Sequence, residues 1–313
     1  MLRYILKRLL LVFVVVLGVT VVTFSVMQSA PGDPAEMIAI GRYGEDLAQE
    51  EIEWVRATEG LDAPIYVQYG IWLSHLLHGD LGNSLITGDP VLSEILTRFP
   101  ATMELAILSM ILSLLIAIPI GIIAAIKQYS IIDNFSMIGA LVGVSMPNFW
   151  LGLLLILFFS LYLGWFPVCG YGGFEHILLP AITLGTGMAA ITTRLTRSSM
   201  LEVLSQDYIR TARAKGLSEK LVINRHALKN AFIPVITIIG LQFGYLLEGV
   251  VIVETIFAWP GVGRLLVDSI FARDFFMIQG CVLFIAIIFA LTNLIVDISY
   301  AYLDPRIRYQ RRD

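Results

Sequence analysis

The sequence predicts an all-α integral membrane protein with six transmembrane helices, and three observations support this prediction. Of its 313 residues, 57% are hydrophobic, and the mean hydropathy is +0.80. Soluble domains are only about half apolar. Six apolar stretches are long enough to cross about 30 Å of hydrocarbon at about 1.5 Å per residue. Basic residues gather in alternate connecting segments, as in proteins that cross a bilayer repeatedly.

We expect spans at approximately 9–28, 105–126, 137–163, 177–197, 231–253 and 277–300. The first follows Arg3, Lys7 and Arg8, so it resembles a signal peptide. Its apolar stretch is longer than the usual core of about 7–15 residues, and no small-x-small cleavage site follows. We therefore expect a retained first transmembrane helix.

The fourth span is the least apolar and is rich in Gly, Ala and Thr. This composition is typical of a helix that faces protein or a water-filled path rather than lipid. Small residues at Gly185 and Ala189 would let another helix approach closely. A buried helix of the bundle and a pore-lining helix both remain open.

Charge segregation predicts the orientation. Basic residues precede the first span and follow the second, the fourth and the sixth, whereas the segment from 31 to 100 is acidic. Six spans place all the basic groups on one side. We therefore expect both termini in the cytoplasm and residues 31–100 outside.

The outer segment is too polar for lipid but has helical patterns. We expect one helix at 46–58 and another after Pro64, which suits a first helical turn. Apolar residues then share one helical face; they are Ile65, Tyr69, Trp72, Leu73 and Leu76. An external helical subdomain follows from these two patterns.

The outer loop 254–263 combines Trp259 with the turn pair Pro260-Gly261. Tryptophan suits a membrane interface, and Pro-Gly suits a tight turn. A short surface helix could follow at 264–276.

The basic connection between the fourth and fifth spans has a helix–Gly–helix pattern. Residues 206–215 favour a helix, and Gly216 suits its left-handed end. Ser218 can cap a second helix, and Pro234 suits an early turn of the next span. The positive-inside rule explains the charges of this loop but not its two-helix layout. A structured basic loop in an apolar chain is suited to docking another protein.

The division we expect is as follows: residues 1–28 with the first span, an external subdomain at 29–100, a core domain at 101–300 that contains the cytoplasmic loop 199–230, and a basic tail at 301–313. The phosphate-loop pattern GxxxxGK[ST] is absent, as are HExxH and GxSxG. The chain is therefore not expected to be an enzyme by itself. Two cysteines in a chain of this length do not make a disulfide framework. We expect packing thiols at Cys169 and Cys281, and a pairing near one membrane face remains the alternative.

The loop resembles the "EAA" coupling loop of bacterial ABC-importer permeases, in the dipeptide, oligopeptide and nickel family. Motifs along nearly the whole chain fit this family. They are TARAKGL at 211–217, RHALKNA at 225–231, PGDP at 31–34, FPAT at 99–102, SMPNFW at 145–150, TRSSM at 196–200, FAWPG at 257–261 and DPR at 304–306.

The resemblance implies half of a translocation pathway in the bacterial or archaeal cytoplasmic membrane, working by alternating access. The implied partners are a homologous second permease, two ATPase subunits, an extracytoplasmic binding protein and membrane lipid, without nucleic acid. ATP and Mg would belong to the ATPases, so this chain binds no cofactor. The residues expected to couple to the ATPase are Asp207, Ala212, Ala214, Lys215, Gly216, Leu217, His226 and Asn230.

The stretches LDAPIYVQYG at 61–70, GYGG at 170–173 and HILLP at 176–180 resemble the nickel branch more than the dipeptide branch. Nickel, free or chelated, is therefore the expected cargo, with di- or oligopeptides as the alternative. Another class, a proton-coupled secondary transporter, would need ionisable relays near mid-membrane and preferably an inverted repeat, and neither is visible. A membrane-embedded hydrolase lacks its motifs.

Polar residues at membrane depth are functional candidates. Asn148, Gln242, Glu248 and Trp259 are the candidates for the pathway or gate, although Glu248 also fits a carboxylate that reaches the outer interface or a partner helix. Asp297 suggests a contact with the partner subunit. His75, His78 and His176 are weak nickel candidates, because two histidines and a carboxylate make an incomplete ligand set.

Overall fold

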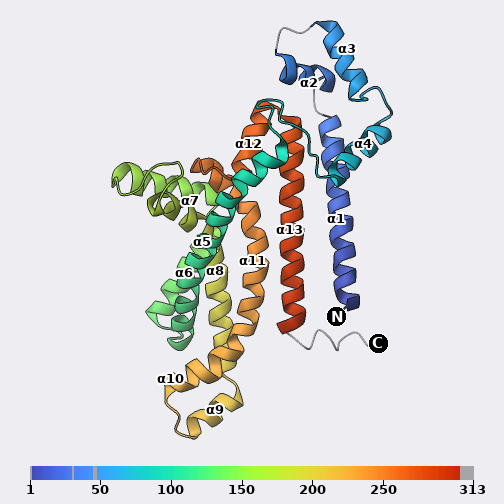
Figure 1. Ribbon diagram of the computed structural model, residues 1–313. Helices are drawn as coiled ribbons and strands as arrows, with labels where there is room; N and C mark the ends of the chain where they lie inside the picture. The colour runs from blue at the N-terminus through green and yellow to red at the C-terminus, as the bar shows by residue number, and fades with distance from the viewer. Residues whose placement is uncertain (1, 30–31, 45–47, 304–313) are drawn as a thin grey trace. The chain divides into compact units, whose positions relative to one another are not determined.

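The computed structural model describes residues 2–29, 32–44 and 48–303, without the side chains of residues 2–4, 37, 41–42, 245, 247–248 and 299–303. The described part is helical (Figure 1). Its one strand-like feature is an isolated bridge between Asn83 and Pro90. The elements are α1 (Leu2–Gln28), α2 (Pro34–Tyr43), α3 (Gln49–Thr58), α4 (Ile65–Leu77), α5 (Val91–Ile126), α6 (Ile131–Ser145), α7 (Asn148–Leu155), the π-helix η1 (Ile156–Tyr162), α8 (Phe174–Leu204), α9 (Asp207–Ala214), α10 (Glu219–Leu221), the π-helix η2 (Val222–Ala227), α11 (Leu228–Ile256), α12 (Val262–Ala272) and α13 (Phe275–Leu303).

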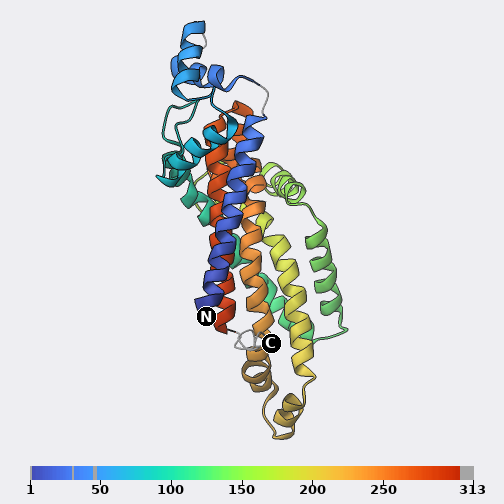
Figure 2. The same ribbon diagram turned by 90° about the vertical axis from the view of Figure 1, so that its right-hand side faces the viewer.

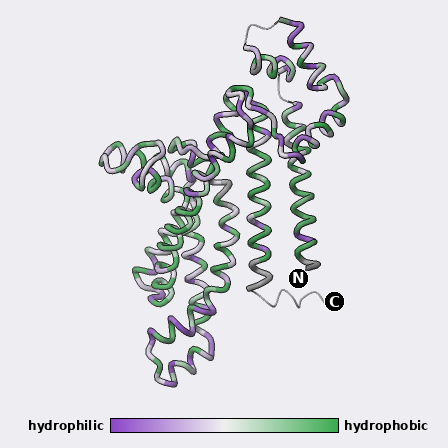
Figure 3. The backbone as a smooth tube through the Cα atoms, in the orientation of Figure 1, coloured by the Kyte–Doolittle hydropathy of each residue, from purple (hydrophilic) through white to green (hydrophobic). Residues whose placement is uncertain are grey.

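Among the described residues, five helices are long and apolar enough to cross a membrane, or up to six if the bent pair of α6 with α7 and η1 is one span. The all-α prediction is confirmed for the described residues. The hydropathic colouring of Figure 3 shows α1 and α13 as almost continuously apolar, whereas α3 and the segment around α9 are hydrophilic.

The third span is not the single helix predicted at 137–163. The chain bends by 107° between α6 and the pair α7–η1. Met146 is extended at φ −79° and ψ 124°, and Pro147 caps α7 at φ −63° and ψ 137°. Proline disfavours the helical conformation for the residue before it and has no N–H to continue the helical hydrogen bonds. The bend therefore follows from the Met146-Pro147 pair.

The chain forms two compact units, residues 1–102 with 260–313, and residues 103–259. In the first unit, α1 packs along α13. Arg8 Nη1 lies 2.7 Å from Asp297 Oδ2, which joins the two helices by an ion pair. Asp297 thus has a partner inside the chain, where the sequence suggested a contact with another subunit.

The helices α2, α3 and α4 extend the first unit beyond the end of α1. Asp33 caps α2, where its Oδ1 accepts from the Ala35 N–H, and its other oxygen pairs with Arg56 of α3. Ile38, Ala39 and Val55 form a small buried cluster between these two helices. The predicted helix at 46–58 is confirmed over the described residues as α3, and Pro64 lies at the N-cap of α4.

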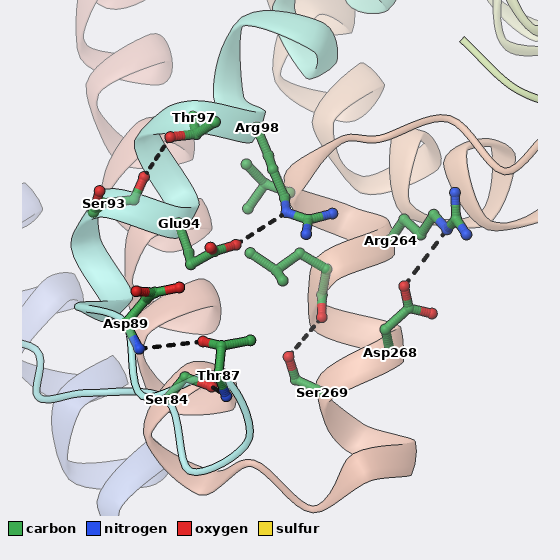
Figure 4. A network of polar contacts seen from close by, with 12 residues as sticks. Ser84, Thr87, Asp89, Ser93, Glu94, Thr97, Arg98, Arg264, Asp268 and Ser269 are labelled. Carbon is green, nitrogen blue, oxygen red and sulfur yellow. Dashed lines mark hydrogen bonds and ion pairs between the residues drawn. The ribbon is translucent and has the colours of Figure 1, made fainter.

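The loop from Leu81 to Pro90 connects α4 to α5 and is held by polar contacts (Figure 4). The Ser84 hydroxyl donates to the Asp274 carboxylate and accepts from the N–H groups of Ile86 and Thr87 at 3.2 and 3.1 Å. The predicted surface helix at 264–276 is α12, which buries Val262 and Leu265 against α13 and the start of α5. It is therefore a packed helix of this unit.

In the second unit, α8 packs against α6, α7 and α11, and Figure 2 shows α6, α8 and α11 side by side. A Cβ added to Gly185 would lie 2.8 Å from the Ser109 carbonyl oxygen of α5. A Cβ at Gly121 of α5 would lie 2.8 Å from the Thr193 carbonyl oxygen of α8. Small residues thus bring two helix backbones together at both positions. The close approach expected at Gly185 is confirmed.

Gly185→Ala is expected to lower the unfolding midpoint of the purified chain in detergent, at a cost of about 1–3 kcal/mol for overpacking a close backbone contact. Gly187→Ala on the same helix is the matched control, because its added Cβ would meet nothing within 4 Å. Equal midpoints for the two variants would contradict the close α5–α8 contact.

Candidate functional site

The segment between α8 and α11, residues 205–227, is the candidate site and contains the short helix α9. One face of α9 is buried through Ile209 and Ala212, which are 0% and 7% exposed. The opposite face is open, with the side chains of Asp207 and Arg210 exposed by 95% and 73%. This helix therefore packs on the unit through one face and presents a charged face outward.

We call the buried contact of this segment the loop cluster. Its fully or nearly buried members come from α5, α8, α9, η2 and α11, and they are Ala125, Met200, Ile209, Ala212, Val222, Ala227 and Ala231. Leu217 packs against it. The ends of three long helices thus meet one face of α9.

The turn after α9 is a Schellman motif. Gly216 has φ +76°, a left-handed conformation that glycine adopts without a Cβ penalty. Its N–H donates to the Arg213 carbonyl at 2.9 Å, and the Leu217 N–H donates to the Ala212 carbonyl at 3.4 Å. Leu217 and Ala212 also share the loop cluster. The predicted role of Gly216 as a left-handed helix end is confirmed.

Two polar contacts fasten this segment. Arg213 of α9 donates to both carboxylate oxygens of Glu219 of α10, at 3.1 Å from Nε and 2.6 Å from Nη2. This hydrogen-bonded partner raises the pKa of Arg213. The Asn230 amide of α11 donates to the Tyr208 hydroxyl at 2.8 Å. Both contacts connect α9 to the chain that follows it.

In the structure, the predicted coupling residues divide into a buried or half-buried group and an exposed group. Ala212 is buried and Leu217 half-buried at the loop cluster, and His226 is half-buried in η2. The exposed group comprises Asp207, Ala214, Lys215, Gly216 and Asn230.

The second helix of the predicted helix–Gly–helix pattern is not separate from the fifth span. The three residues of α10 continue through the π-helix η2 directly into α11, which also contains Pro234. Ser218 occupies the N-cap position without a side-chain hydrogen bond. A π-helix at this junction is typical of functional positions in helices.

An ion pair that the sequence analysis missed lies beside this segment. Asp133 in the first turn of α6 is 1% exposed, and Arg197 of α8 donates to both its oxygens at 2.5 and 2.7 Å. The Tyr129 N–H also donates to Asp133 at 2.9 Å. The sequence feature that indicated this acid is its position three residues after Ser130, which is a capping pattern at the start of an apolar run. The pair fixes the α5–α6 turn to α8 one turn before Met200 of the loop cluster.

Two pathway candidates lie at the packing of α8 and α11 with their neighbours. Gln242 of α11 is 3% exposed and its Oε1 accepts from the Thr192 hydroxyl of α8 at 3.2 Å. Its Nε2 has no hydrogen-bond partner among the described residues. Asn148 begins α7, and its amide nitrogen would lie 3.2 Å from a Cβ on Gly249 of α11. Both side chains face other helices.

Trp259 is completely buried, so it is not an exposed interfacial side chain as the sequence suggested. Its ring packs edge-on against Tyr171, with centroids 4.7 Å apart. The Gly170 N–H donates to the Phe257 carbonyl, and the Tyr171 hydroxyl donates to Glu104 at 3.0 Å. The Glu104 carboxylate raises the pKa of Tyr171. The loop before α8 therefore covers the end of α11.

The side chain of Glu248 lies outside the described residues. Glu254, one and a half turns later on α11, is fully buried, which the sequence analysis missed. A lone acid within an apolar run was its signal.

His75 and His176 each lie beside one carboxylate, that of Asp80 and that of Glu175. His75 Nδ1 lies 3.3 Å from Asp80 Oδ2, and His78 Nδ1 contacts the Ser74 carbonyl oxygen at 2.7 Å. His176 belongs to the other unit. Among the described residues, no three His, Cys, Asp or Glu side chains are grouped so that they could hold a metal ion. Cys169 and Cys281 are free thiols.

Asp133→Asn is expected to destabilise the protein by about 3–5 kcal/mol, because it leaves the Arg197 charge partly buried without its partner. Arg197→Met should cost a similar amount, and the double variant should recover part of the loss. Thermal unfolding of the purified chain measures the change in stability of each variant. Glu202→Gln, at an exposed acid of α8, is the control and should change stability by less than about 0.5 kcal/mol. Additive losses in the double variant would contradict the pairing.

Known membrane transport proteins resemble this chain in sequence. The family described as "Binding-protein-dependent transport system inner membrane component" matches residues 117–309, and its N-terminal companion matches residues 1–106. The chain is 47% identical to the glutathione transport system permease protein GsiC of Salmonella paratyphi A, over 99% of this chain and 100% of that protein. It is 45% identical, over the same shares, to the dipeptide transport system permease protein DppB of Alkalihalophilus pseudofirmus.

A solved structure, "Crystal structure of an amino acid ABC transporter with histidines", is similar in fold, with a TM-score of 0.53 and 14% identity over 67% of this chain and 94% of that one. The family matches cover most of the chain and include the segment between α8 and α11. Such a protein is not an enzyme by itself, and it works with an ATPase and a substrate-binding protein. The chain belongs to the inner membrane permease subunits of binding-protein-dependent ABC importers.

Proposed function

We propose that this permease imports short peptides, and that its segment at 205–227 transmits movement from an ATPase. Support for the cargo comes from the relatives, which are named for glutathione, itself a tripeptide, and for dipeptides. Those names favour the peptide alternative over the nickel branch that three sequence stretches suggested. The absence of a three-ligand group among the described residues also gives nickel no support.

The observation that supports coupling most strongly is the two-sided character of α9. Its outer face offers the exposed Asp207 and Arg210 to a partner. Its inner face joins the ends of α5, α8 and α11 through the loop cluster. A force applied by an ATPase to the outer face would therefore reach three long helices together. Ala214, Lys215 and Gly216 lie at the exposed end of the same helix.

The assembly that we propose contains a homologous second permease, two ATPase subunits and an extracytoplasmic binding protein. ATP and Mg belong to the ATPases. Both termini and residues 199–230 face the cytoplasm, residues 29–100 form the external subdomain, and the core domain extends from 101 to 300. The charge segregation of the sequence supports this orientation.

We also propose that the contact of α8 with α11 changes during alternating access. At this contact Gln242 keeps a buried Nε2 that has no hydrogen-bond partner among the described residues. Buried polar groups without partners cost about 1–3 kcal/mol each. A state in which water or cargo reaches them would remove that cost. Asn148, Glu248 and Trp259 remain the other proposed pathway or gate residues.

Cells that carry this chain with its partner permease, ATPases and binding protein are expected to take up labelled dipeptides or glutathione. Uptake should require ATP and persist when the proton gradient is dissipated with ATP maintained. Radioactive nickel, free and chelated, is the comparison substrate. Nickel uptake without peptide uptake would reverse the proposed cargo, and loss of uptake with the gradient would favour a secondary transporter.

Gly216→Val is expected to lower peptide uptake by about 5- to 30-fold. The reason is that an L-amino acid other than glycine pays about 1–2 kcal/mol to adopt the left-handed backbone conformation. The cost is conformational, since an added Cβ would meet nothing within 4 Å. Gly216→Asn is the matched control, as asparagine tolerates this conformation and should retain most uptake. ATP hydrolysis and uptake by the reconstituted importer measure coupling. Equal uptake by both variants and the wild type would refute this role for the turn.

A further inference from the structure

A cavity of about 680 Å³ lies within the first unit, outside the proposed coupling segment. Its walls are the last turn of α1, one face of α4, the loop that begins at Leu81, and the first turns of α13. Small-molecule sites usually enclose about 300–1,000 Å³. The volume is therefore sufficient for a short peptide or another molecule of that size.

The walls of this cavity are fixed before any ligand arrives. The Ser84 hydroxyl donates to Asp274, a carboxylate that is 2% exposed and caps α13 by accepting from the Met277 N–H at 3.2 Å. Gly82 donates its N–H to Asp80 Oδ1 at 2.9 Å. A Cβ on Gly82 would lie 3.2 Å from the Phe276 ring. The loop is thus held to α13 by both polar and ring contacts.

One side of the cavity is aromatic. Phe24 of α1 and Trp72 of α4 line it with their ring centroids 5.7 Å apart, and Phe276 of α13 lines it from the other helix. Tyr69 supports this wall, where it packs edge-on against Phe24 at 5.4 Å and shares a hydrogen bond of 2.9 Å with the Thr20 hydroxyl. Such a surface suits an apolar side chain of a ligand.

The carboxylates Glu59 and Asp80 line the cavity, and no Lys or Arg occurs among the described residues that line it. His75 also lines it, with its Nδ1 3.3 Å from Asp80 Oδ2. A phosphate or a carboxylate would find no Lys or Arg there, which disfavours an anionic lipid headgroup. An ammonium group would be attracted by the two carboxylates.

A buried amide provides the third feature. Gln279 of α13 lines the cavity and is only 9% exposed. A side-chain amide can both donate and accept. A peptide bond offers the matching acceptor and donor.

We propose that this cavity binds the amino-terminal end of a short apolar peptide. The ammonium group lies near Asp80 and Glu59, the first peptide bond pairs with Gln279, and the side chain packs between Phe24 and Trp72. The cavity itself indicates a ligand with an amine, and that this ligand is a peptide rests on the proposed function. The cavity would then receive cargo directly on the permease, in addition to any site on the binding protein.

The test is isothermal titration of the full-length chain in nanodiscs, without binding protein, using Leu-Leu and N-acetyl-Leu-Leu as probes. Leu-Leu should bind, and acetylation should weaken binding at least about 10-fold by removing the charge. Asp80→Asn preserves an acceptor for the Gly82 N–H and should weaken Leu-Leu binding by a similar factor. Gln279→Leu should weaken it by about 3- to 10-fold.

Glu53→Gln is the matched control, since Glu53 is an exposed acid of α3 outside the cavity and should bind as the wild type does. An unfolding midpoint without ligand identifies any variant that fails to fold, and Asp80→Asn keeps the test valid if Gln279→Leu fails. Equal binding of the two probes, or wild-type affinity in both cavity variants, overturns the proposal. A co-purified phospholipid that occupies the cavity and is not displaced by Leu-Leu also overturns it.

The uptake assay separates this inference from the proposed function. Normal peptide uptake with no Leu-Leu binding to the chain refutes the cavity and leaves the function intact. Binding of Leu-Leu to the chain without peptide uptake by the assembled importer refutes the function and supports the cavity as a site for an amine.

Discussion

The second unit depends on the close approach of α8 to its neighbours. In a bilayer, helices gain little from the hydrophobic effect when they meet, so packing of small residues and interhelical hydrogen bonds hold them together. Gly185 and Gly121 leave no room for a side chain between α5 and α8. A Cβ on Gly143 of α6 would lie 3.3 Å from the Ala190 Cβ of α8, a looser contact. The composition that makes α8 the least apolar span is therefore the composition that lets it pack against several helices.

This packing supports the proposed role of the segment after α8 in transmitting movement. The buried Asp133–Arg197 pair joins α6 to α8, and the loop cluster begins one turn later at Met200. The Schellman turn at Gly216 then returns the chain to α11 through Glu219 and η2. Each connection uses a different interaction: an ion pair, an apolar cluster and a backbone turn. A displacement of α9 would therefore be shared by the helices that meet it.

Local features of the sequence predicted much of this structure. Gly216 predicted its turn and Pro64 predicted the start of α4. The Gly/Ala/Thr content of the fourth span indicated a helix that faces protein or a water-filled path, and it did not decide between the two. Features that depend on distant residues were not predictable in this way. Asp133 and Arg197 are 64 positions apart, and the burial of Trp259 requires Tyr171 from another loop. The bend at Met146-Pro147 was visible as a proline, but a proline can either kink a helix or end it.

The rigid attachment of α9 is the central claim, and a distance measurement tests it most directly. Cys169 and Cys281 would be replaced, and spin labels placed at Arg210 of α9 and at Lys127 after α5, both of which are exposed in the same unit. The distance between the labels would be measured in the assembled importer with and without bound ATP. The account predicts one narrow distance that is the same in both states. A distance that broadens or shifts on ATP binding would show that α9 moves independently of the helices and would contradict the account.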